Sequence, residues 1–154
     1  MAGKIAGTVF TLFIMTFLVA VIIFYFLHTG IKEEVNDVNY SVAETVATSG
    51  EFTTDLYDFL EKSLGRYGDY RIKLKLEEQI SPGEYDINFE NSYVLNRKLK
   101  VGDRVTIFLE DKDPSLFGRL INAAIAGYRP DRMIDTNIKS LKTAIISNNA
   151  VGTE

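Results

Sequence analysis

A long apolar stretch runs from Ile5 to Leu27 and reads IAGTVFTLFIMTFLVAVIIFYFL. It contains 23 residues and no charge, and about 20 apolar residues in a helix cross the hydrocarbon core of a bilayer. A cleaved signal peptide has a shorter apolar core, of roughly 7 to 15 residues, followed by small residues at a cleavage site. Here the stretch ends in Tyr25-Phe26-Leu27-His28 instead. The sequence therefore predicts an uncleaved transmembrane helix over residues 1–28.

The charges around this helix predict its orientation. Lys4 and the N-terminal amine are the positive charges before the span, whereas the mixed sequence Ile31-Lys32-Glu33-Glu34 follows it. The positive-inside rule then places the N-terminus in the cytoplasm. We expect a single-pass protein of the cell envelope with its C-terminal domain outside.

The apolar pattern continues beyond the span with helical spacing. Its members are Ile31, Val35, Val38, Val42 and Val46, at steps of four, three, four and four residues. Such a stripe is typical of an amphipathic helix, and Gly50 suits the left-handed position past a helix end. The sequence predicts an amphipathic helix over residues 29–50 that continues the first as one rod, from about residue 3 to 49.

Residues 51–154 predict one extracytoplasmic globular domain. A helix is expected from Asp55 to Leu64, with Thr53 or Thr54 as its cap, and another from Ser115 to Ala126. Their predicted inward residues are Leu56, Phe59, Leu60 and Leu64, then Leu116, Leu120, Ile121 and Ala124. Alternation of apolar and polar residues predicts strands over 70–76, 85–89 and 105–109, the third central, and a last strand within 133–146 with a bulge near Ser140.

The predicted fold class is therefore α+β. A long N-terminal hydrophobic helix continues into an amphipathic helix, which packs on a small antiparallel sheet of three or four strands.

Composition and motifs argue against several function classes. The net charge of −4 and the pI near 5.1 do not suit nucleic acid binding, and no Cys is present for a thiolate nucleophile or a Cys-ligated metal. His28, the one histidine, has no acid beside it in sequence. The acidic run Glu110-Asp111-Lys112-Asp113 lacks the spacing of a calcium loop. We expect a protein without catalytic residues, cofactor or metal ion.

Two groups of residues are candidates for contacts between molecules. Gly3, Gly7 and Thr11 recur at four-residue steps, a ladder of small residues that lets another helix approach closely. Because glycine is common in membrane helices, a plain anchor could carry the same ladder. Arg129 and Arg132 could meet an acidic face of a neighbouring subunit, and the alternative is an exposed, self-paired loop. The candidate acidic face carries Glu33, Glu34 and Asp37.

The order of these elements resembles type IV pilins and their relatives, most closely the TadE-like pseudopilins. The similar features are the apolar anchor, the stretch VAETVATSG at 42–50, the strand NRKLKVGDRVTIFLED at 96–111 and the step Leu116-Phe117-Gly118. The resemblance implies a filament in which the hydrophobic helices pack at the centre and the globular domains face solvent. Phe10, Phe13 and Phe17 would then fill gaps between helices.

One feature of the pilin family differs. Pilins usually carry Gly before the processing site and Glu five residues into the mature chain. Cleavage after Gly3 would place Thr8 at that position here, and cleavage after Gly7 would place Leu12 there.

The resemblance thus implies a structural subunit of a pilus-like extracellular filament. Its partners would be copies of itself, the membrane before assembly, and pilus-assembly machinery. The alternative is a single-span accessory protein, a minor pseudopilin of a secretion, conjugation or DNA-uptake apparatus. An anchored enzyme or small-ligand sensor would need a convergent polar pocket, which the sequence does not predict.

Overall fold

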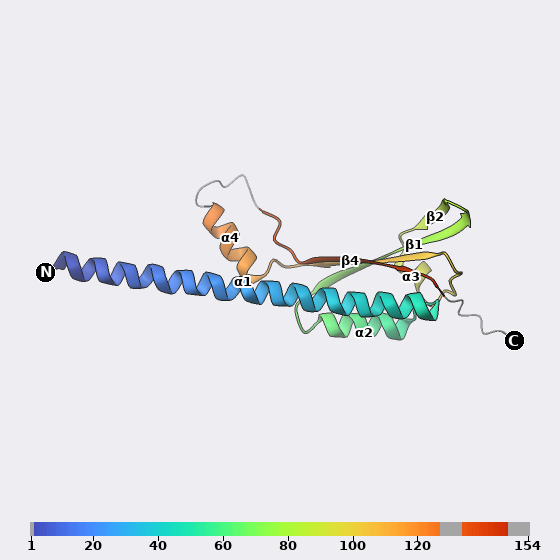
Figure 1. Ribbon diagram of the computed structural model, residues 1–154, viewed down its shortest axis with the longest axis horizontal. Coiled ribbons are helices and arrows are strands. Elements are labelled where there is room, and N and C mark those ends of the chain that lie inside the picture. The colour runs from blue at the N-terminus through green and yellow to red at the C-terminus, as the bar shows by residue number, and fades with distance from the viewer. Residues whose placement is uncertain (1, 127–133, 148–154) are drawn as a thin grey trace. The chain divides into compact units, whose positions relative to one another are not determined.

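The computed structural model describes residues 2–126 and 134–147. The chain divides into a helical unit, Met1–Ile31 with Pro114–Thr136, and a sheet unit, Lys32–Asp113 with Asn137–Glu154. Helix α1, Ala2–Ser49, begins in the helical unit and ends in the sheet unit (Figure 1). The helical unit also contains helix α4, Leu116–Ala126. The other helices and strands belong to the sheet unit.

Helix α1 confirms the predicted rod. It runs without a break through Gly30, in agreement with the small cost, about 1 kcal/mol, of one glycine in a helix. It stops where the sequence predicted, because Gly50 adopts φ 68° and its amide donates to the Val46 carbonyl over 2.9 Å. A left-handed glycine of this kind is a common way to end a helix.

The second half of α1 packs through its valine stripe. Val35, Val42 and Val46 are completely buried, and each buried valine contributes roughly 1.5–3 kcal/mol through the area removed from water. Asn39 lies on the same face, also fully buried, and its Nδ2 donates to Ser140 Oγ over 2.9 Å. This half of α1 is thereby fixed against the sheet.

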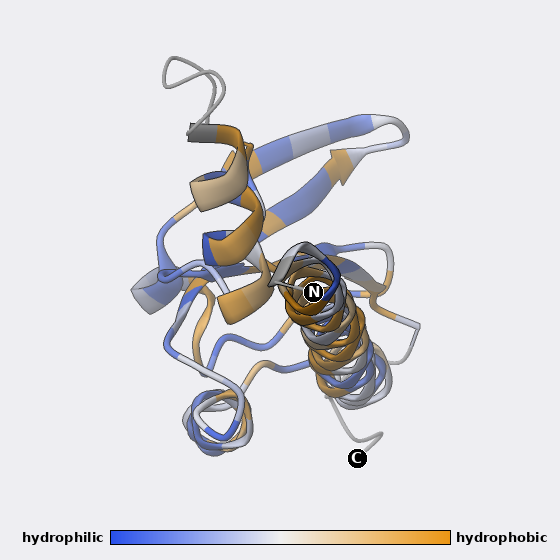
Figure 2. Cartoon of the chain, turned by 90° about the vertical axis from the view of Figure 1, so that its left-hand side faces the viewer, coloured by the Kyte–Doolittle hydropathy of each residue, from blue (hydrophilic) through white to orange (hydrophobic). Residues whose placement is uncertain are grey.

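The sheet has four antiparallel strands in the order β2-β1-β3-β4, which confirms the predicted α+β class. The strands are β1 Tyr70–Ser81, β2 Glu84–Asn88, β3 Arg104–Asp111 and β4 Lys139–Ile145. As predicted, β3 is an inner strand. The second half of α1 and helix α2, Thr54–Leu64, lie on one side of the sheet (Figures 1 and 2), and the alternating apolar residues of β1 and β3 point there and are buried.

Strand β4 corrects one prediction. Ser140 pairs with Leu109 and Leu141 with Phe108 in unbroken register, so the bulge predicted near Ser140 is wrong. The apolar alternation slips there because Ser140 points inward to Asn39 while Leu141 points outward. The register shift of this sheet lies instead between Gln79 and Ser81, next to the β1–β2 turn.

Helix α2 follows its prediction closely. Thr53 is the cap, because its Oγ1 accepts the Leu56 amide over 3.2 Å. Leu60 and Leu64 are buried as expected, but Phe59 is 54% exposed, so its assignment to the core is wrong.

A short helix that the sequence did not predict, α3 Asn91–Val94, protects the edge of β1. Strand β2 pairs with β1 from Leu76 onward, which leaves the earlier edge of β1 without a neighbouring strand. The Asn91 side chain accepts the Leu74 amide over 2.8 Å and donates to the Ile72 carbonyl over 3.0 Å. One amide side chain thus replaces a stretch of strand at an edge that could otherwise pair with another chain.

Candidate functional site

The first half of α1 is apolar and uncovered. Every residue from Gly3 to Val19 is exposed, including Phe10 at 65%, Phe13 at 69% and Phe17 at 48%. Figure 2 looks at the N-terminal end of this helix and shows the hydrophobic colouring along it. The helix is long and apolar enough to cross a membrane. A surface of this kind suits lipid or other apolar helices rather than water.

The predicted ladder of small residues is open for a close partner. A Cβ added at Gly3 or Gly7 would meet nothing within 4 Å. At 100° per residue, Gly3, Gly7 and Thr11 lie within an arc of about 80°, and the three phenylalanines occupy the neighbouring arc. The structure therefore places the two sets of predicted contact residues on adjacent strips of one helix.

The hydroxyl groups of this segment are satisfied within the helix. Thr8 Oγ1 donates to Lys4 O over 3.0 Å, Thr11 Oγ1 to Gly7 O over 2.9 Å, and the Thr16 hydroxyl to the Leu12 carbonyl over 2.9 Å. Unsatisfied polar groups in hydrocarbon cost several kcal/mol each. The segment can therefore lie in lipid, or leave it, without breaking these bonds.

Helix α4 starts against the end of this segment. The ring of Phe117 lies 5.6 Å from that of Tyr25 and 5.5 Å from that of His28, measured between centroids. His28 Nδ1 lies 2.8 Å from Ser115 Oγ, which also accepts the Gly118 amide over 3.1 Å. No sequence pattern predicts this contact, because His28 and Ser115 are 87 positions apart.

A serine beside a histidine invites comparison with nucleophilic catalysis, which needs a histidine held by a third group and donors for an oxyanion. Here the Ser115 oxygen also caps the first turn of α4, as N-cap side chains do. Its hydroxyl can donate to His28 while accepting the Gly118 amide. We interpret the His28–Ser115 pair as a structural hydrogen bond that holds the start of α4 against α1.

The burial of the α4 side chains differs from the prediction. Leu116 is 66% exposed and Ala124 is also exposed, so their assignment as inward residues is wrong, whereas Leu120 and Ile121 are half-buried. The pattern identified an apolar helix correctly, but it did not predict Phe117, whose ring packs against Tyr25 and His28 of α1. Periodicity shows that a helix has an apolar face without showing what covers it.

Two contacts hold the segment after α4 against the helix. The Asn122 side chain donates to the Ile134 carbonyl over 3.1 Å and accepts the Ile134 amide over 2.9 Å. Gly118 allows a close approach, since an added Cβ would lie 2.8 Å from Thr136 Cβ.

The predicted acidic face divides into two parts. Glu33 and Asp37 are exposed, and at 100° per residue they lie on the side of α1 opposite its valine stripe. Glu34 accepts a hydrogen bond from the Tyr67 hydroxyl over 3.2 Å. Desolvation, and after it the Glu34 carboxylate, raises the pKa of Tyr67. The predicted partners Arg129 and Arg132 lie outside the described residues.

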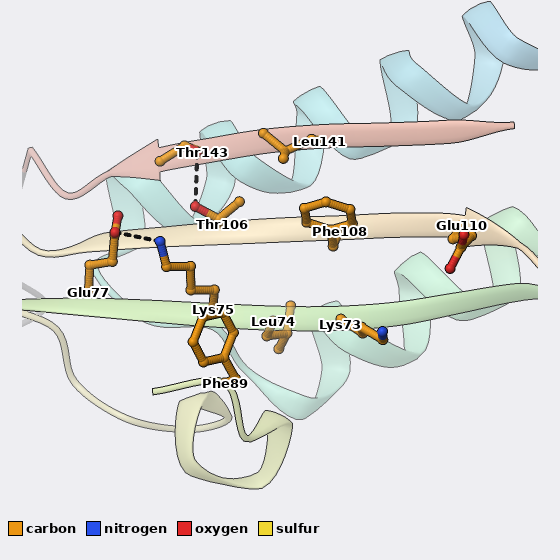
Figure 3. A pocket seen from close by; sticks show the side chains of 10 residues that line it. All are labelled: Lys73, Leu74, Lys75, Glu77, Phe89, Thr106, Phe108, Glu110, Leu141 and Thr143. Atoms are coloured by element: carbon orange, nitrogen blue, oxygen red, sulfur yellow. Dashed lines mark hydrogen bonds and ion pairs between the residues drawn. The ribbon is translucent and has the colours of Figure 1, made fainter. Parts of the chain in front are cut away.

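The outer side of the sheet carries an open groove that sequence reasoning missed (Figure 3). Its volume is about 540 Å³, and its floor includes Phe108, 44% exposed, beside Leu141, 52% exposed. Lys75 Nζ pairs with Glu77 Oε1 over 2.6 Å along one end. The remaining lining residues are Lys73, Leu74, Phe89, Thr106, Glu110 and Thr143. Outward alternation of Leu141 and Thr143 in β4 was the available signal, and the wrongly predicted bulge concealed it.

The acidic run at the end of β3 has structural partners. Glu110 bridges Arg71 over 3.5 Å and Lys139 over 3.3 Å. Asp111 Oδ1 accepts the Asp113 amide over 3.1 Å, and Lys112 pairs with Asp69 over 2.9 Å. The carboxylates therefore diverge, and the described residues contain no group of three or more His, Cys, Asp or Glu able to hold a metal ion.

No protein-family model matches the chain, and no curated protein or solved structure matches it. The resemblance to pilins therefore rests on the layout of the elements.

Proposed function

We propose that the chain is a structural, non-catalytic subunit of a pilus-like extracellular filament that polymerises through the apolar first half of α1. One observation carries this proposal: a single continuous helix changes character along its length. Its first half is apolar and exposed, and its second half is buried under a sheet by a valine stripe. A pilin needs both halves, one for the polymer and one to hold the globular domain.

The physical route to a polymer is an exchange of contacts. In a bilayer, the side chains of residues 3–27 face lipid tails, so burying them against other helices brings little hydrophobic gain. Association then depends on close packing, which Gly3 and Gly7 permit and which the neighbouring phenylalanines complete. The threonine hydroxyls keep their own carbonyl partners throughout.

The same proposal assigns the other partners. The chain resides in the membrane before assembly, with its sheet unit outside, and pilus-assembly machinery extracts it. Glu33 and Asp37, exposed on α1, and Glu34 would meet Arg129 and Arg132 of a neighbouring copy.

The second candidate is a single-span accessory protein of a secretion, conjugation or DNA-uptake apparatus. The observation that favours it is the charge distribution of the apolar helix. Lys4 is its one charged residue, so it has no carboxylate to pair with the N-terminal amine of a neighbour. A chain that stays in lipid requires no such pair.

Electron microscopy of sheared surface material, with mass spectrometry of any fibres, tests the proposal. Gly7→Leu fills the space that the ladder leaves open and should abolish fibres, while the variant remains in the membrane. Ile5→Leu is the matched control, because Ile5 lies on roughly the opposite side of the helix and is already apolar. It should form fibres like the unmodified chain.

Each other outcome is informative. Fibres from Gly7→Leu in normal amount would contradict the small-residue contact. An unmodified chain that stays in the membrane fraction without fibres would favour the accessory protein.

A further inference from the structure

We propose that α4 is a membrane-surface helix, which lies in the boundary between headgroups and acyl chains on the outer side of the bilayer. This inference rests on only one part of the proposed function, namely that the apolar half of α1 lies in a bilayer. It does not depend on a filament.

Helix α4 begins beside the end of the apolar stretch of α1. The apolar stretch from Ile5 ends at Leu27, and its 23 residues extend about 35 Å against a hydrocarbon core of about 30 Å. Tyr25 and His28 therefore reach the interface, where aromatic rings with polar groups are favoured. Phe117 contacts both rings, and Ser115 lies 2.8 Å from His28. The first turn of α4 is thus held at headgroup level.

Helix α4 is short and mostly apolar. Its sequence is LFGRLINAAIA, with Arg119 as the one charged residue. Eleven residues extend about 16 Å, too short to cross a bilayer. A short apolar helix that starts at the interface can lie along the surface but cannot span it.

The side chains of α4 are distributed unevenly around the helix axis. At 100° per residue, Leu116, Leu120 and Ala124 share an arc of about 80°, and Leu116 is 66% exposed. Asn122 lies on roughly the opposite side, and Arg119 lies about 60° from Leu116, beside this arc. The Asn122 side chain donates to the Ile134 carbonyl and accepts the Ile134 amide, so these two hydrogen bonds would be kept on burial.

Two observations favour lipid as the medium around Leu116, Leu120 and Ala124. Helix α4 is joined through Phe117 to Tyr25 and His28, at the end of the apolar half of α1, so its exposed apolar side chains lie near the surface that we propose to face lipid. Arg119 is exposed and cationic, which suits lipid phosphates beside an apolar face.

Depth-dependent fluorescence quenching tests the inference. Because the chain has no Cys, single-cysteine variants can carry one environment-sensitive dye each. Leu116→Cys and Ala123→Cys report on α4, Val19→Cys on the span, and Thr48→Cys on an exposed position of the sheet unit. The full chain is reconstituted in vesicles of phosphatidylcholine and phosphatidylglycerol that contain spin-labelled lipid.

The inference predicts that both α4 labels shift to the blue and are quenched several-fold more than the Thr48 label. A shallow spin label should quench them more than a deep one, and the Val19 label should show the reverse order. If the α4 labels behave like Thr48 while Val19 is quenched, the inference is wrong and the span stands. If Val19 is not quenched either, the membrane location of α1 fails together with the inference.

A second copy of the chain could cover α4 instead of lipid. The α4 labels would then resist both spin-labelled lipid and aqueous iodide, and this result would overturn the inference.

Discussion

At the scale of single residues, Tyr70 combines burial with an unmet hydrogen bond. It is 8% exposed, and its hydroxyl has no hydrogen-bond partner among the described residues. Burial, and after it the Asp111 carboxylate, raises the pKa of Tyr70 to about 12, from its ordinary value of 10. The folded state therefore disfavours the tyrosinate. The stability linked to this group is intact below pH 10 and is lost as the pH rises from 10 towards 12.

Replacement of Tyr70 by Phe tests this account. At pH 7 the free energy of unfolding should change by less than about 1 kcal/mol, because the lost hydroxyl had no partner. By pH 11 the variant should escape an alkaline loss of about 1–1.5 kcal/mol, because the linked stability is lost completely only above pH 12. Urea unfolding of the full chain in detergent micelles, followed by circular dichroism from pH 7 to 11, measures both effects. Tyr40→Phe is the exposed control, and equal alkaline loss in all three proteins would contradict the account.

Residue-level features were predictable where their cause is local. Gly50 and Thr53 followed from helix-ending and helix-capping rules, which involve neighbours a few positions away. Asn39 with Ser140, and His28 with Ser115, join residues 101 and 87 positions apart. Such pairs exist because the fold brings two elements together, and no spacing in the sequence encodes them.

At the scale of elements, the valine stripe of α1 is the contact that joins the helix to the sheet. Val42→Ala should lower the free energy of unfolding of the sheet unit by about 2–3 kcal/mol. Two buried carbons are lost at about 0.8 kcal/mol each, and a cavity remains. Thr45→Ala, on the exposed side of the same helix, should change it by less than about 0.5 kcal/mol. Denaturant unfolding of both variants compares them, and equal effects would show that the stripe does not hold the helix.

The predictability of the strands depended on where their large apolar residues point. In β1 and β3 most of these residues point inward, with Phe108 of β3 as an outward exception, so alternation located both strands correctly. In β4 the inward positions hold Ser140, Lys142 and Ala144, while Leu141 and Ile145 point outward. The usual assumption that large apolar residues point inward then assigns the wrong face of β4 to the core. It also suggests a bulge near Ser140. Helix α3 was missed because four residues are too few for a helical period.

At the scale of the whole chain, the order of elements was enough to predict the α+β class. An uncharged stretch, a valine stripe and alternating strands each have a distinct period, and none depends on distant contacts. The candidate contact residues Gly3, Gly7 and Thr11 were likewise visible in sequence. The groove on the outer side of the sheet and the contact of α4 with α1 were not, because each combines elements distant in sequence.

In the proposed filament, α1 would join copies of the chain through Gly3, Gly7 and Thr11. Disulfide cross-linking of full-length single-cysteine variants in membranes tests this contact, since the native chain has no Cys. We predict that oxidation converts Gly7→Cys to a covalent dimer and leaves Ile5→Cys, on roughly the opposite side, monomeric. Absence of the Gly7→Cys dimer, or equal amounts of dimer from both variants, would contradict the proposed contact between helices.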